Sequence, residues 1–346
     1  MADTMKVAVM TANNKVEIIQ RPIPKAGRGE ALIKLEYVGV CGSDLHLYEH
    51  AWGGLVKEPY VLGHEAAGTV VALGEGVTTL AVGDRVALEP GRTCGSCEFC
   101  KTGRYNLCPD VQFFAAPPVD GVFQEYVAHE AALCFKLPEN VSTMEGALIE
   151  PLAVGMHAAA LGEAGPGHIA VVTGSGCIGL VSLMALKIRG VSKVIVVDVL
   201  ANRLAKAKEL GADEVIDASR EDVAAMVRKY TDGAGCDLVI ETAGSEQSVG
   251  QAVQYCKKGA VIVIVGYSRS GTMTIPTTLA ADKELTFKTV YRYRNIYPVA
   301  IKSVAAGLAN LKDIVSKVYN LDDIQAGLDA SVKNKAELTK VVIKIA

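Results

Sequence analysis

Apolar runs alternate with amphipathic segments between about residues 168 and 289, and this alternation constrains the fold more than any other feature of the sequence. Four of the apolar runs read HIAVVTG, KVIVVDV, CDLVIETAG and AVIVIVGY, and segments such as LVSLMALKIRG and ANRLAKAKELGA between them have helical spacing. Neighbouring parallel strands need long crossover connections, which are usually helices. The alternation therefore predicts an α/β domain with a doubly wound parallel sheet.

A glycine-rich turn follows the first of these strands. The segment Gly174-Ser175-Gly176-Cys177-Ile178-Gly179 comes directly after IAVVT and opens a helix. Gly174 permits the tight turn, Gly176 lets the backbone approach a pyrophosphate, and Gly179 allows the helix to pack closely. Unpaired N–H groups at the helix N-terminus then face the anion. The segment predicts a dinucleotide site that also includes Cys177 and Ile178.

The next strand, KVIVVD, ends in an acid that indicates which dinucleotide binds. Asp198 lies nineteen residues after Gly179, where a carboxylate accepts hydrogen bonds from the adenosine ribose and repels a 2′-phosphate. We therefore expect NAD rather than NADP as the cofactor. Arg203 either stacks on the adenine or pairs with Asp198; a position facing a phosphate would weaken the preference for NAD.

Length and local pattern indicate more than one domain. The 346 residues exceed the usual size of one hydrophobic core, so we expect two domains. Residues 5–86 contain short β-type runs separated by Asn, Gly and Pro turn signals, which predicts a β-rich unit. The end of the chain, beyond YRYRNIYPVAIKSVAAGLANL, has the pattern of a helix followed by the strand LTKVVIKIA.

Charge and composition favour a small-molecule partner. The formal net charge is only −3 and no run of five like charges occurs, which argues against binding to nucleic acid or to an anionic membrane. The start of the chain lacks the pattern of a signal peptide, and no apolar stretch has the length of a membrane span. We expect a cytoplasmic location, with the nine cysteines reduced or bound to metal.

Four of the cysteines lie close together on a short loop: Cys94, Cys97, Cys100 and Cys108. Thiolates are soft ligands that suit tetrahedral zinc, and four of them leave no coordination position for a substrate. We therefore predict a structural zinc ion in a lobe at residues 90–110.

A second group of candidate ligands is dispersed along the chain: Cys41 in VGVCGSDLH, His64 and Glu65 in VLGHEAAGTV, and Glu150 in ALIEPLAV. Any one of these side chains alone is more often structural than functional. Together they offer sulfur, nitrogen and oxygen ligands, as a catalytic zinc site with one open position does.

The sequence resembles the zinc-containing medium-chain dehydrogenases, and within them the sorbitol (polyol) dehydrogenase family, over essentially its whole length. The resemblance rests on GVCGSDLH, PYVLGHEAAGTVVALGEGV, GDRVALEPG, the four-cysteine lobe, GALIEPLAVGMHA, VTGSGCIGL, VVDVLANRLAKAKELGAD and VYRYRNIYPVAI. It implies a GroES-like β-barrel catalytic domain over residues 1–153, a Rossmann domain over 154–290 and a return segment over 291–346 that completes the first domain. The active site is then expected in the cleft between the two domains.

The resemblance also implies residue roles. Cys41, His64 and Glu65 are expected to bind the catalytic zinc, while Glu150 either contacts the metal-bound water or is itself the ligand in place of Glu65. Further cofactor contacts are expected from two segments, namely Val265, Gly266, Tyr267, Val290, Tyr291 and Arg292.

The implied reaction is oxidation of a secondary alcohol of a polyol by hydride transfer to NAD. Ser43 and His46 are expected to relay the proton to solvent, and Arg292 and Tyr293 to hydrogen-bond the polyol hydroxyls. The chain departs from the family at Leu47, where sorbitol dehydrogenases often carry tyrosine; whether the adjacent Tyr48 replaces it is open. A homotetramer or a dimer is also implied.

Two rival functions remain. A threonine-type or simple alcohol dehydrogenase would use the same scaffold, although the RYRN segment favours polyols. A non-catalytic dinucleotide sensor, or a crystallin-like structural protein, would need no open zinc site, so intact Cys41, His64, Glu65 and Glu150 argue against it.

Overall fold

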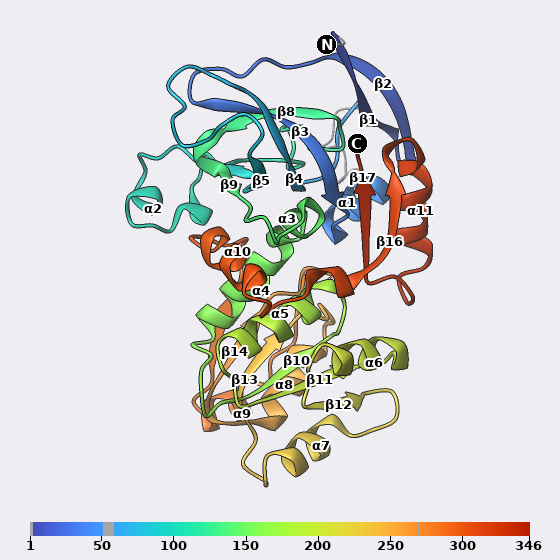
Figure 1. The fold of residues 1–346 in the computed structure, drawn as a ribbon. Helices are drawn as coiled ribbons and strands as arrows, with labels where there is room; N and C mark the ends of the chain where they lie inside the picture. The colour runs from blue at the N-terminus through green and yellow to red at the C-terminus, as the bar shows by residue number, and fades with distance from the viewer. Residues whose placement is uncertain (1–2, 51–58, 269) are drawn as a thin grey trace. The chain divides into compact units, whose positions relative to one another are not determined.

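The computed structural model describes residues 3–50, 59–268 and 270–346, and the chain divides into two compact units. Unit 1 comprises residues 1–150, 297–305 and 311–346, and unit 2 comprises residues 151–296 and 306–310 (Figure 1). The boundaries expected from the sequence, after residues 153 and 290, stay predictions for the functional division of the chain.

Unit 2 is built on a six-stranded sheet in which every neighbouring pair is parallel, and its order is β12-β11-β10-β13-β14-β15 (Figure 1). The strands are β10 (Ile169–Thr173), β11 (Lys193–Asp198), β12 (Glu214–Asp217), β13 (Cys236–Glu241), β14 (Cys256–Ile264) and β15 (Thr286–Thr289). In chain order this is 3-2-1-4-5-6, the order of two mononucleotide-binding halves joined at a switch point. The predicted doubly wound sheet is confirmed.

Helices connect these strands and cover them. They are α5 (Cys177–Ile188), α6 (Ala201–Glu209), α7 (Val223–Tyr230), α8 (Ser248–Tyr255) and α9 (Thr277–Asp282), and the unit begins within α4 (Ile149–Leu161). Apolar residues of α7, α8 and α9 share one buried cluster with strand residues such as Val171, Ile195 and Val239. These strands read as continuous apolar runs because they are buried on both faces.

Unit 1 is mainly antiparallel. Its seven-stranded sheet has the order β16-β17-β3-β4-β5-β9, and β8 also pairs with β3. The strands are β3 (Glu30–Gly39), β4 (Glu65–Leu73), β5 (Arg85–Leu88), β8 (Tyr126–Glu130), β9 (Cys134–Lys136), β16 (Val315–Asn320) and β17 (Lys340–Lys344), beside the hairpin of β1 (Thr4–Ala12) and β2 (Lys15–Pro22) and the short pair β6 (Gly91–Arg92) and β7 (Gln112–Phe113).

The end of the chain belongs to this first sheet. Strand β17 pairs antiparallel with β3 through Val342 and Gly39, so the last residues lie beside a strand near the beginning of the chain. The helical segments of unit 1 are α1 (Gly42–His50), α2 (Glu98–Lys101), η2 (Tyr105–Leu107), η3 (Ala131–Leu133), α3 (Thr143–Ala147), α10 (Tyr297–Ala305), η4 (Leu311–Ile314), η5 (Leu321–Asp323) and α11 (Ile324–Lys333).

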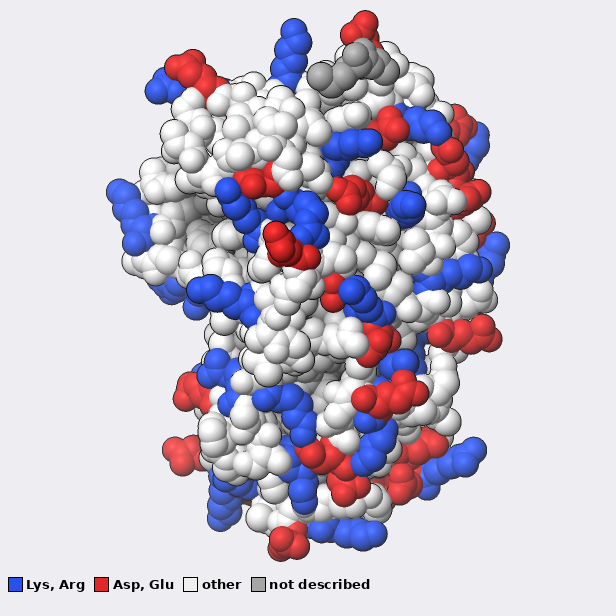
Figure 2. Space-filling model, in the orientation of Figure 1, with Lys and Arg blue, Asp and Glu red and all other residues white. Residues whose placement is uncertain are grey.

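Charged side chains of both signs are interspersed over the face of the molecule shown in Figure 2. Within the described residues, no helix combines the length and the apolar character that crossing a membrane requires.

Candidate metal and cofactor sites

Three side chains that are dispersed in the sequence come together at one place in unit 1. The ligand atoms of Cys41, His64 and Glu65 all lie within 4.8 Å of one another. Cys41 lies just before α1, and His64 and Glu65 lie where β4 begins, so the ends of two neighbouring strands bring them together. A thiol, an imidazole and a carboxylate are the mixed donor set of an open zinc site.

The buried acid Asp44 orients two of these ligands. Its carboxylate accepts hydrogen bonds from the backbone N–H groups of Cys41 and Gly63, both at 2.9 Å. His64 Nδ1 lies 3.5 Å from Asp44 Oδ1. A carboxylate beside one ring nitrogen fixes the imidazole and leaves the other nitrogen, Nε2, for a metal.

The surroundings of His64 favour positive charge. Burial by itself lowers the pKa of this ring, but Asp44 and Cys41 more than offset it, so the pKa of His64 lies well above its ordinary value. Burial raises the pKa of Asp44, and the His64 ring and two backbone N–H groups outweigh it, so Asp44 stays ionised. A dication would find the same favourable field at this place.

Glu65 is held from the opposite side by the last strand of the chain. Lys340 Nζ donates a hydrogen bond to Glu65 Oε1 at 2.6 Å, and both side chains are buried. Lys340 Nζ also lies 2.5 Å from Glu65 Oε2, but this second contact lacks hydrogen-bond geometry, and Oε2 has no hydrogen-bond partner among the described residues. A buried carboxylate oxygen that has an ion-pair partner but no hydrogen bond, beside a thiol and an imidazole, fits a bound cation.

A glycine makes room for this pair of charges. A Cβ on Gly39 would lie 2.0 Å from Glu65 Oε2 and 3.1 Å from Lys340 Cε. Only a residue without a side chain can therefore occupy this position of β3 while Glu65 keeps its place.

An aromatic ring covers His64. The ring centroid of Phe113, in β7, lies 5.5 Å from that of His64 at an interplanar angle of 53°. No motif in the sequence marked Phe113, Asp44, Gly39 or Lys340 as part of this site. The signals available were the aromatic pair in QFFAAPP, the acid in CGSD and a lysine that opens the apolar run KVVIK.

The other residues predicted for this site are placed as follows. Glu150 is buried in the first turn of α4, but it is not a member of the group formed by the three ligand atoms in the described part of the chain. Ser43 and His46 are exposed on α1, and the His46 ring lies 5.2 Å from that of His50.

Tyr48 does not take the place of the tyrosine that is missing at position 47. Tyr48 is fully buried, and its hydroxyl donates to Asp329 Oδ1 at 2.7 Å and lies 2.9 Å from the Asn14 carbonyl. Burial, and next the Asp329 carboxylate, raise the pKa of Tyr48. The hydroxyl is therefore part of a structural contact between α1 and α11.

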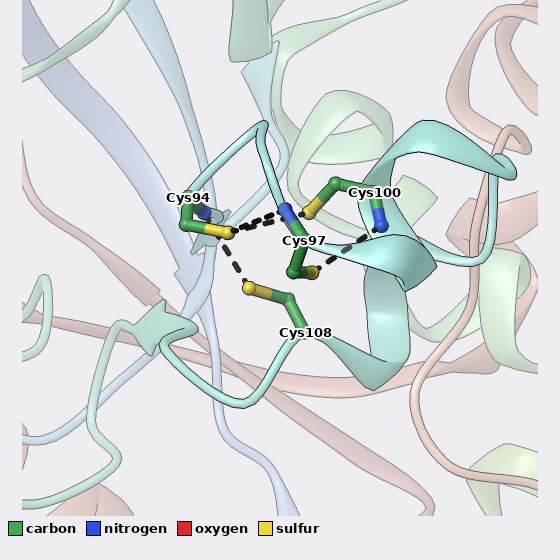
Figure 3. A group of neighbouring side chains, drawn as sticks. All are labelled: Cys94, Cys97, Cys100 and Cys108. Atoms are coloured by element: carbon green, nitrogen blue, oxygen red, sulfur yellow. Dashed lines mark hydrogen bonds between the residues drawn. The ribbon is translucent and has the colours of Figure 1, made fainter.

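The four clustered cysteines point toward one another (Figure 3). Their sulfur atoms all lie within 4.8 Å of each other, and Cys94 Sγ is 4.0 Å from Cys100 Sγ. Thiolates bound to zinc at about 2.3 Å in a tetrahedron are separated by about 3.8 Å. The cluster therefore already has nearly the dimensions of a zinc site.

Backbone N–H groups donate to several of these sulfur atoms, and the net effect of the surroundings differs between the thiols. Burial and the neighbouring thiols raise the pKa of Cys97 to about 11 and also raise that of Cys108, whereas the pKa of Cys94 is lowered. Cys97 N donates to Cys94 Sγ at 3.3 Å, and Cys94 N donates to Cys108 Sγ at 3.4 Å. The backbone N–H and the hydroxyl of Ser96, with the Cys97 N–H, lower the pKa of the Cys94 thiol to about 6. A thiol that ionises near neutral pH is ready to bind metal.

In unit 2 the glycine-rich turn has the conformation that its sequence predicts. Gly174 follows β10 with φ of +86°, which only glycine adopts readily, and α5 begins at Cys177. A Cβ on Gly179 would lie 1.9 Å from the Gly174 carbonyl oxygen, so the third glycine is needed for close packing. The Arg203 side chain lies beside Gly176, with Nη1 3.9 Å from the position that a Cβ on Gly176 would occupy.

Asp198 holds the same turn. Its Oδ2 accepts from the Ser175 backbone N–H at 2.7 Å and from the Ser175 hydroxyl at 3.2 Å. Its Oδ1 accepts from the N–H groups of Val199 and Leu200 at 2.8 and 3.0 Å. The carboxylate thereby joins the ends of β10 and β11, the two strands at which a nucleotide half-site is expected.

The remaining predicted residues lie in two segments after β14 and β15. Val265 and Gly266 are half-buried and Tyr267 is 80% exposed; in the second segment Val290 and Tyr293 are buried, whereas Tyr291 is exposed. Arg292 has a φ of +56°, and its guanidinium lies 4.8 Å from the centre of the Tyr291 ring. A bulky residue in the left-handed region is strained, and such strain often marks functional sites.

Comparison with known proteins places the chain in a family. Residues 27–139 match the alcohol dehydrogenase GroES-like domain, and residues 177–306 match the zinc-binding dehydrogenase domain. Human sorbitol dehydrogenase is 45% identical over 305 residues, which cover 87% of this chain and 85% of that protein. Sorbitol dehydrogenase of Bacillus subtilis is 40% identical over 341 residues, covering 98% of this chain and 97% of the relative.

The solved structures agree. The crystal structure of ECK1772, an Escherichia coli oxidoreductase/dehydrogenase of unknown specificity involved in membrane biogenesis, matches with a TM-score of 0.96 and 43% identity over 99% of both chains. The GroES-like and Rossmann fold expected from the sequence is thus confirmed. The chain belongs to the sorbitol dehydrogenase family of the zinc-binding, medium-chain dehydrogenases.

Proposed function

We propose that this enzyme is a zinc-dependent, NAD-linked polyol dehydrogenase that oxidises a secondary alcohol to a ketone, yielding a ketose. The observation that carries the proposal is the convergence of Cys41, His64 and Glu65 within 4.8 Å, with one buried Glu65 oxygen free of hydrogen bonds in the described residues. Sorbitol dehydrogenases at 40 to 45% identity support the substrate class.

Cys41, His64 and Glu65 would hold the catalytic zinc, and Glu150 would contact the water in the open position. Bound there, zinc supplies a Lewis acid that favours the alkoxide of the substrate, and NAD supplies the hydride acceptor. Asp44 keeps the His64 ring in the orientation that leaves Nε2 available. Phe113 limits the access of water to that ring from one side.

The proton of the alcohol must leave the site before or during hydride transfer. Ser43 and His46 are both exposed on α1, close in sequence to Cys41, and would pass this proton to solvent. On the substrate side, Arg292 and Tyr293 would orient the polyol by hydrogen bonds to its hydroxyls, and the strained backbone at Arg292 fits a side chain held in one direction.

The four-cysteine lobe would bind a second, structural zinc. Its ligand set is closed because Cys94, Cys97, Cys100 and Cys108 fill all four positions of a tetrahedron. The two ions would therefore differ in role: one stabilises the lobe, and the other keeps a position for the substrate.

NAD is the proposed cofactor because the Asp198 carboxylate would repel the 2′-phosphate of NADP. A ribose hydroxyl would replace the Ser175 hydroxyl, whose 3.2 Å contact with Asp198 is the longest of the four. Arg203, whose guanidinium lies beside Gly176, would face the pyrophosphate, which NAD and NADP share, and not the 2′-phosphate that distinguishes NADP. Initial rates with the two cofactors test the assignment, and a clear preference for NADP would refute it.

The substrate class is tested by NADH formation with a stereochemical panel of polyols, 2,3-butanediol, simple alcohols and L-threonine. We expect turnover with polyols that stops when chelator removes the catalytic zinc. Preference for threonine or a simple alcohol would support the alternative dehydrogenases on this scaffold. Tight NADH binding without metal at the Cys41 site and without turnover would support a dinucleotide sensor.

We also propose that the enzyme forms a homotetramer or a dimer. Light scattering coupled to size-exclusion chromatography measures the mass directly, and a mass near 36.4 kDa, that of one chain, would contradict this. The cytoplasmic location expected from the sequence stays a prediction.

A further inference from the structure

The segment at the end of β13, residues 241–244, has no role in the function proposed above, although its side chains hydrogen-bond both to the glycine-rich turn and to the turn that follows β13. Its first residue, Glu241, is fully buried. Glu241 Oε1 accepts a hydrogen bond from the Gly244 backbone N–H at 2.9 Å and from the Ser248 hydroxyl at 2.8 Å. The carboxylate therefore fixes the turn that follows β13.

Glu241 also fixes the segment that follows β14. Its backbone carbonyl accepts from the N–H groups of Val265 and Gly266 at 2.8 and 3.0 Å. A Cβ on Gly266 would lie 2.4 Å from Gly244 N and 2.8 Å from Glu241 Oε2, and a Cβ on Gly244 would lie 2.6 Å from the Tyr267 carbonyl oxygen. The turn at Gly244 and the segment 265–267 are thus in direct backbone contact, and the Glu241 carboxylate lies beside this contact.

The next residue, Thr242, connects the end of β13 to the glycine-rich turn that follows the neighbouring strand β10. Its hydroxyl oxygen lies 2.8 Å from the Thr173 carbonyl and 3.1 Å from the Gly174 carbonyl, to which it donates. A Cβ on Gly174 would be 3.0 Å from this oxygen, and a Cβ on Gly179 would be 3.1 Å from it. Thr242 therefore occupies the space between the first and third glycines of the turn.

We propose that Glu241 and Thr242 are positioning residues that set the two halves of the cofactor site separately. The strand order 3-2-1-4-5-6 divides the sheet into one mononucleotide half at β10 to β12 and another at β13 to β15. Thr242 holds the glycine-rich turn, which binds the phosphates. Glu241 holds residues 265–267 of the second half, which receives the nicotinamide nucleotide, in two ways: directly through its backbone carbonyl, and through its carboxylate, which fixes the Gly244 turn against that segment. This inference rests on the proposed NAD-dependent function.

Two probes separate the halves, because NADH occupies both and ADP lacks the nicotinamide riboside. Their dissociation constants are measured by calorimetry for the wild type, Glu241→Leu, Glu241→Gln and Thr242→Val. Glu241→Leu removes both carboxylate oxygens and keeps the backbone carbonyl, so it releases Gly244 and Ser248, the turn that packs against Gly266. We expect it to weaken NADH binding about tenfold and ADP binding less than about twofold. Glu241→Gln keeps one acceptor oxygen and should restore NADH binding to within about threefold. Thr242→Val should weaken the binding of NADH and of ADP by a similar factor.

Equal weakening of NADH and ADP by Glu241→Leu, or unchanged binding of both, would overturn the inference. If that variant does not fold, Ser248→Ala decides, because it removes one donor to the same Oε1 atom. If Ser248→Ala weakens NADH binding more than ADP binding, the proposal is supported, and unchanged NADH binding overturns it. A failure of the proposed function would be seen in the wild type itself, which would then not bind NADH or would bind it without oxidising any polyol.

Discussion

Lys340 donates a hydrogen bond of 2.6 Å to Glu65, although the two residues are 275 positions apart in the sequence. The ammonium group also donates to the Val40 carbonyl at 2.9 Å, and only 3% of the lysine side chain and 1% of the glutamate side chain are exposed. The last strand of the chain thereby supplies the counter-charge for a candidate zinc ligand near its beginning.

Replacing Lys340 should destabilise the protein strongly. Lys340→Met leaves the Glu65 carboxylate buried without its partner, which costs about 3 to 5 kcal/mol of the free energy of unfolding. Urea unfolding of the chelator-treated protein measures this. The matched control is Lys344→Met, an exposed position on the same strand, with an expected change within about 0.5 kcal/mol. Equal stability of the two variants would contradict the assigned role of the pair.

The two proposed zinc sites should lose their ions independently of each other. Cys41→Ser is expected to remove one zinc per chain and to lower kcat by about a hundredfold or more, because the Lewis acid is lost. Cys97→Ser should remove the other ion, lower the melting temperature and leave kcat within about twofold where the protein stays folded. Elemental analysis measures the metal, with the buried Cys134→Ala as control. Loss of both ions from either variant would show that the sites are not independent.

The Tyr48 hydroxyl should contribute to stability and not to substrate binding. Tyr48→Phe removes the hydrogen bond to Asp329 and should lower the free energy of unfolding by about 1 to 2 kcal/mol. The KM for the polyol should not change. A raised KM with unchanged stability would instead mean that this hydroxyl contacts the substrate.

The proton relay should be visible in the pH profile of turnover. Ser43→Ala and His46→Asn are expected to lower kcat by about tenfold or more near neutral pH, with recovery at high pH where hydroxide removes the proton. His50→Asn is the control, since His50 is an exposed histidine on the same helix whose ring lies 5.2 Å from His46. Full turnover and an unchanged profile in Ser43→Ala would eliminate the relay.

Stability should depend on pH through Glu89. Burial raises the pKa of this carboxyl to about 7, although the Tyr105 hydroxyl, at 2.7 Å, partly offsets the rise. Between the ordinary value of 4.5 and about 7, the folded state binds a proton that the unfolded state has lost. The stabilising contribution of the protonated form is complete below pH 4.5 and is lost as the pH rises through 7.

Glu89→Gln removes this dependence and keeps an acceptor for Tyr105. Relative to the wild type, the variant should therefore gain stability between pH 4.5 and 7, by up to about 3 kcal/mol. Thermal unfolding across this window, with the exposed Glu139→Gln as control, measures the difference. A difference that stays constant with pH would contradict the assignment.

The local sequence pattern was sufficient to predict the features that are formed by a contiguous segment. The alternation of strands and helices predicted the parallel sheet of unit 2, and the glycine-rich turn could be assigned residue by residue because its constraints, a φ of +86° at Gly174 and the packing of Gly179, are local. The four cysteines follow the same rule, since a short loop forces their sulfur atoms together.

Local pattern failed where charges meet across the sheet. Asp44 and Lys340 have no sequence signal that separates them from surface charges, and Gly39 has none that separates it from an ordinary strand glycine. Their roles arise from the pairing of β3 with β4 and β17, which buries them beside Glu65 and His64. In the same way, Glu241 and Thr242 read as the end of a strand until β10 and β14 are placed beside them.

The sequence by itself determined the parallel sheet, the dinucleotide turn and the four-cysteine lobe, because periodicity and short-range geometry are properties of neighbouring residues. The dispersed candidates Cys41, His64 and Glu65 followed from the family resemblance. Only the tertiary structure decided which buried partner each ligand has, that Tyr48 is committed to Asp329, and that the last strand neutralises Glu65. These depend on which strands pair, and strand pairing minimises the free energy of the whole chain rather than that of any one segment.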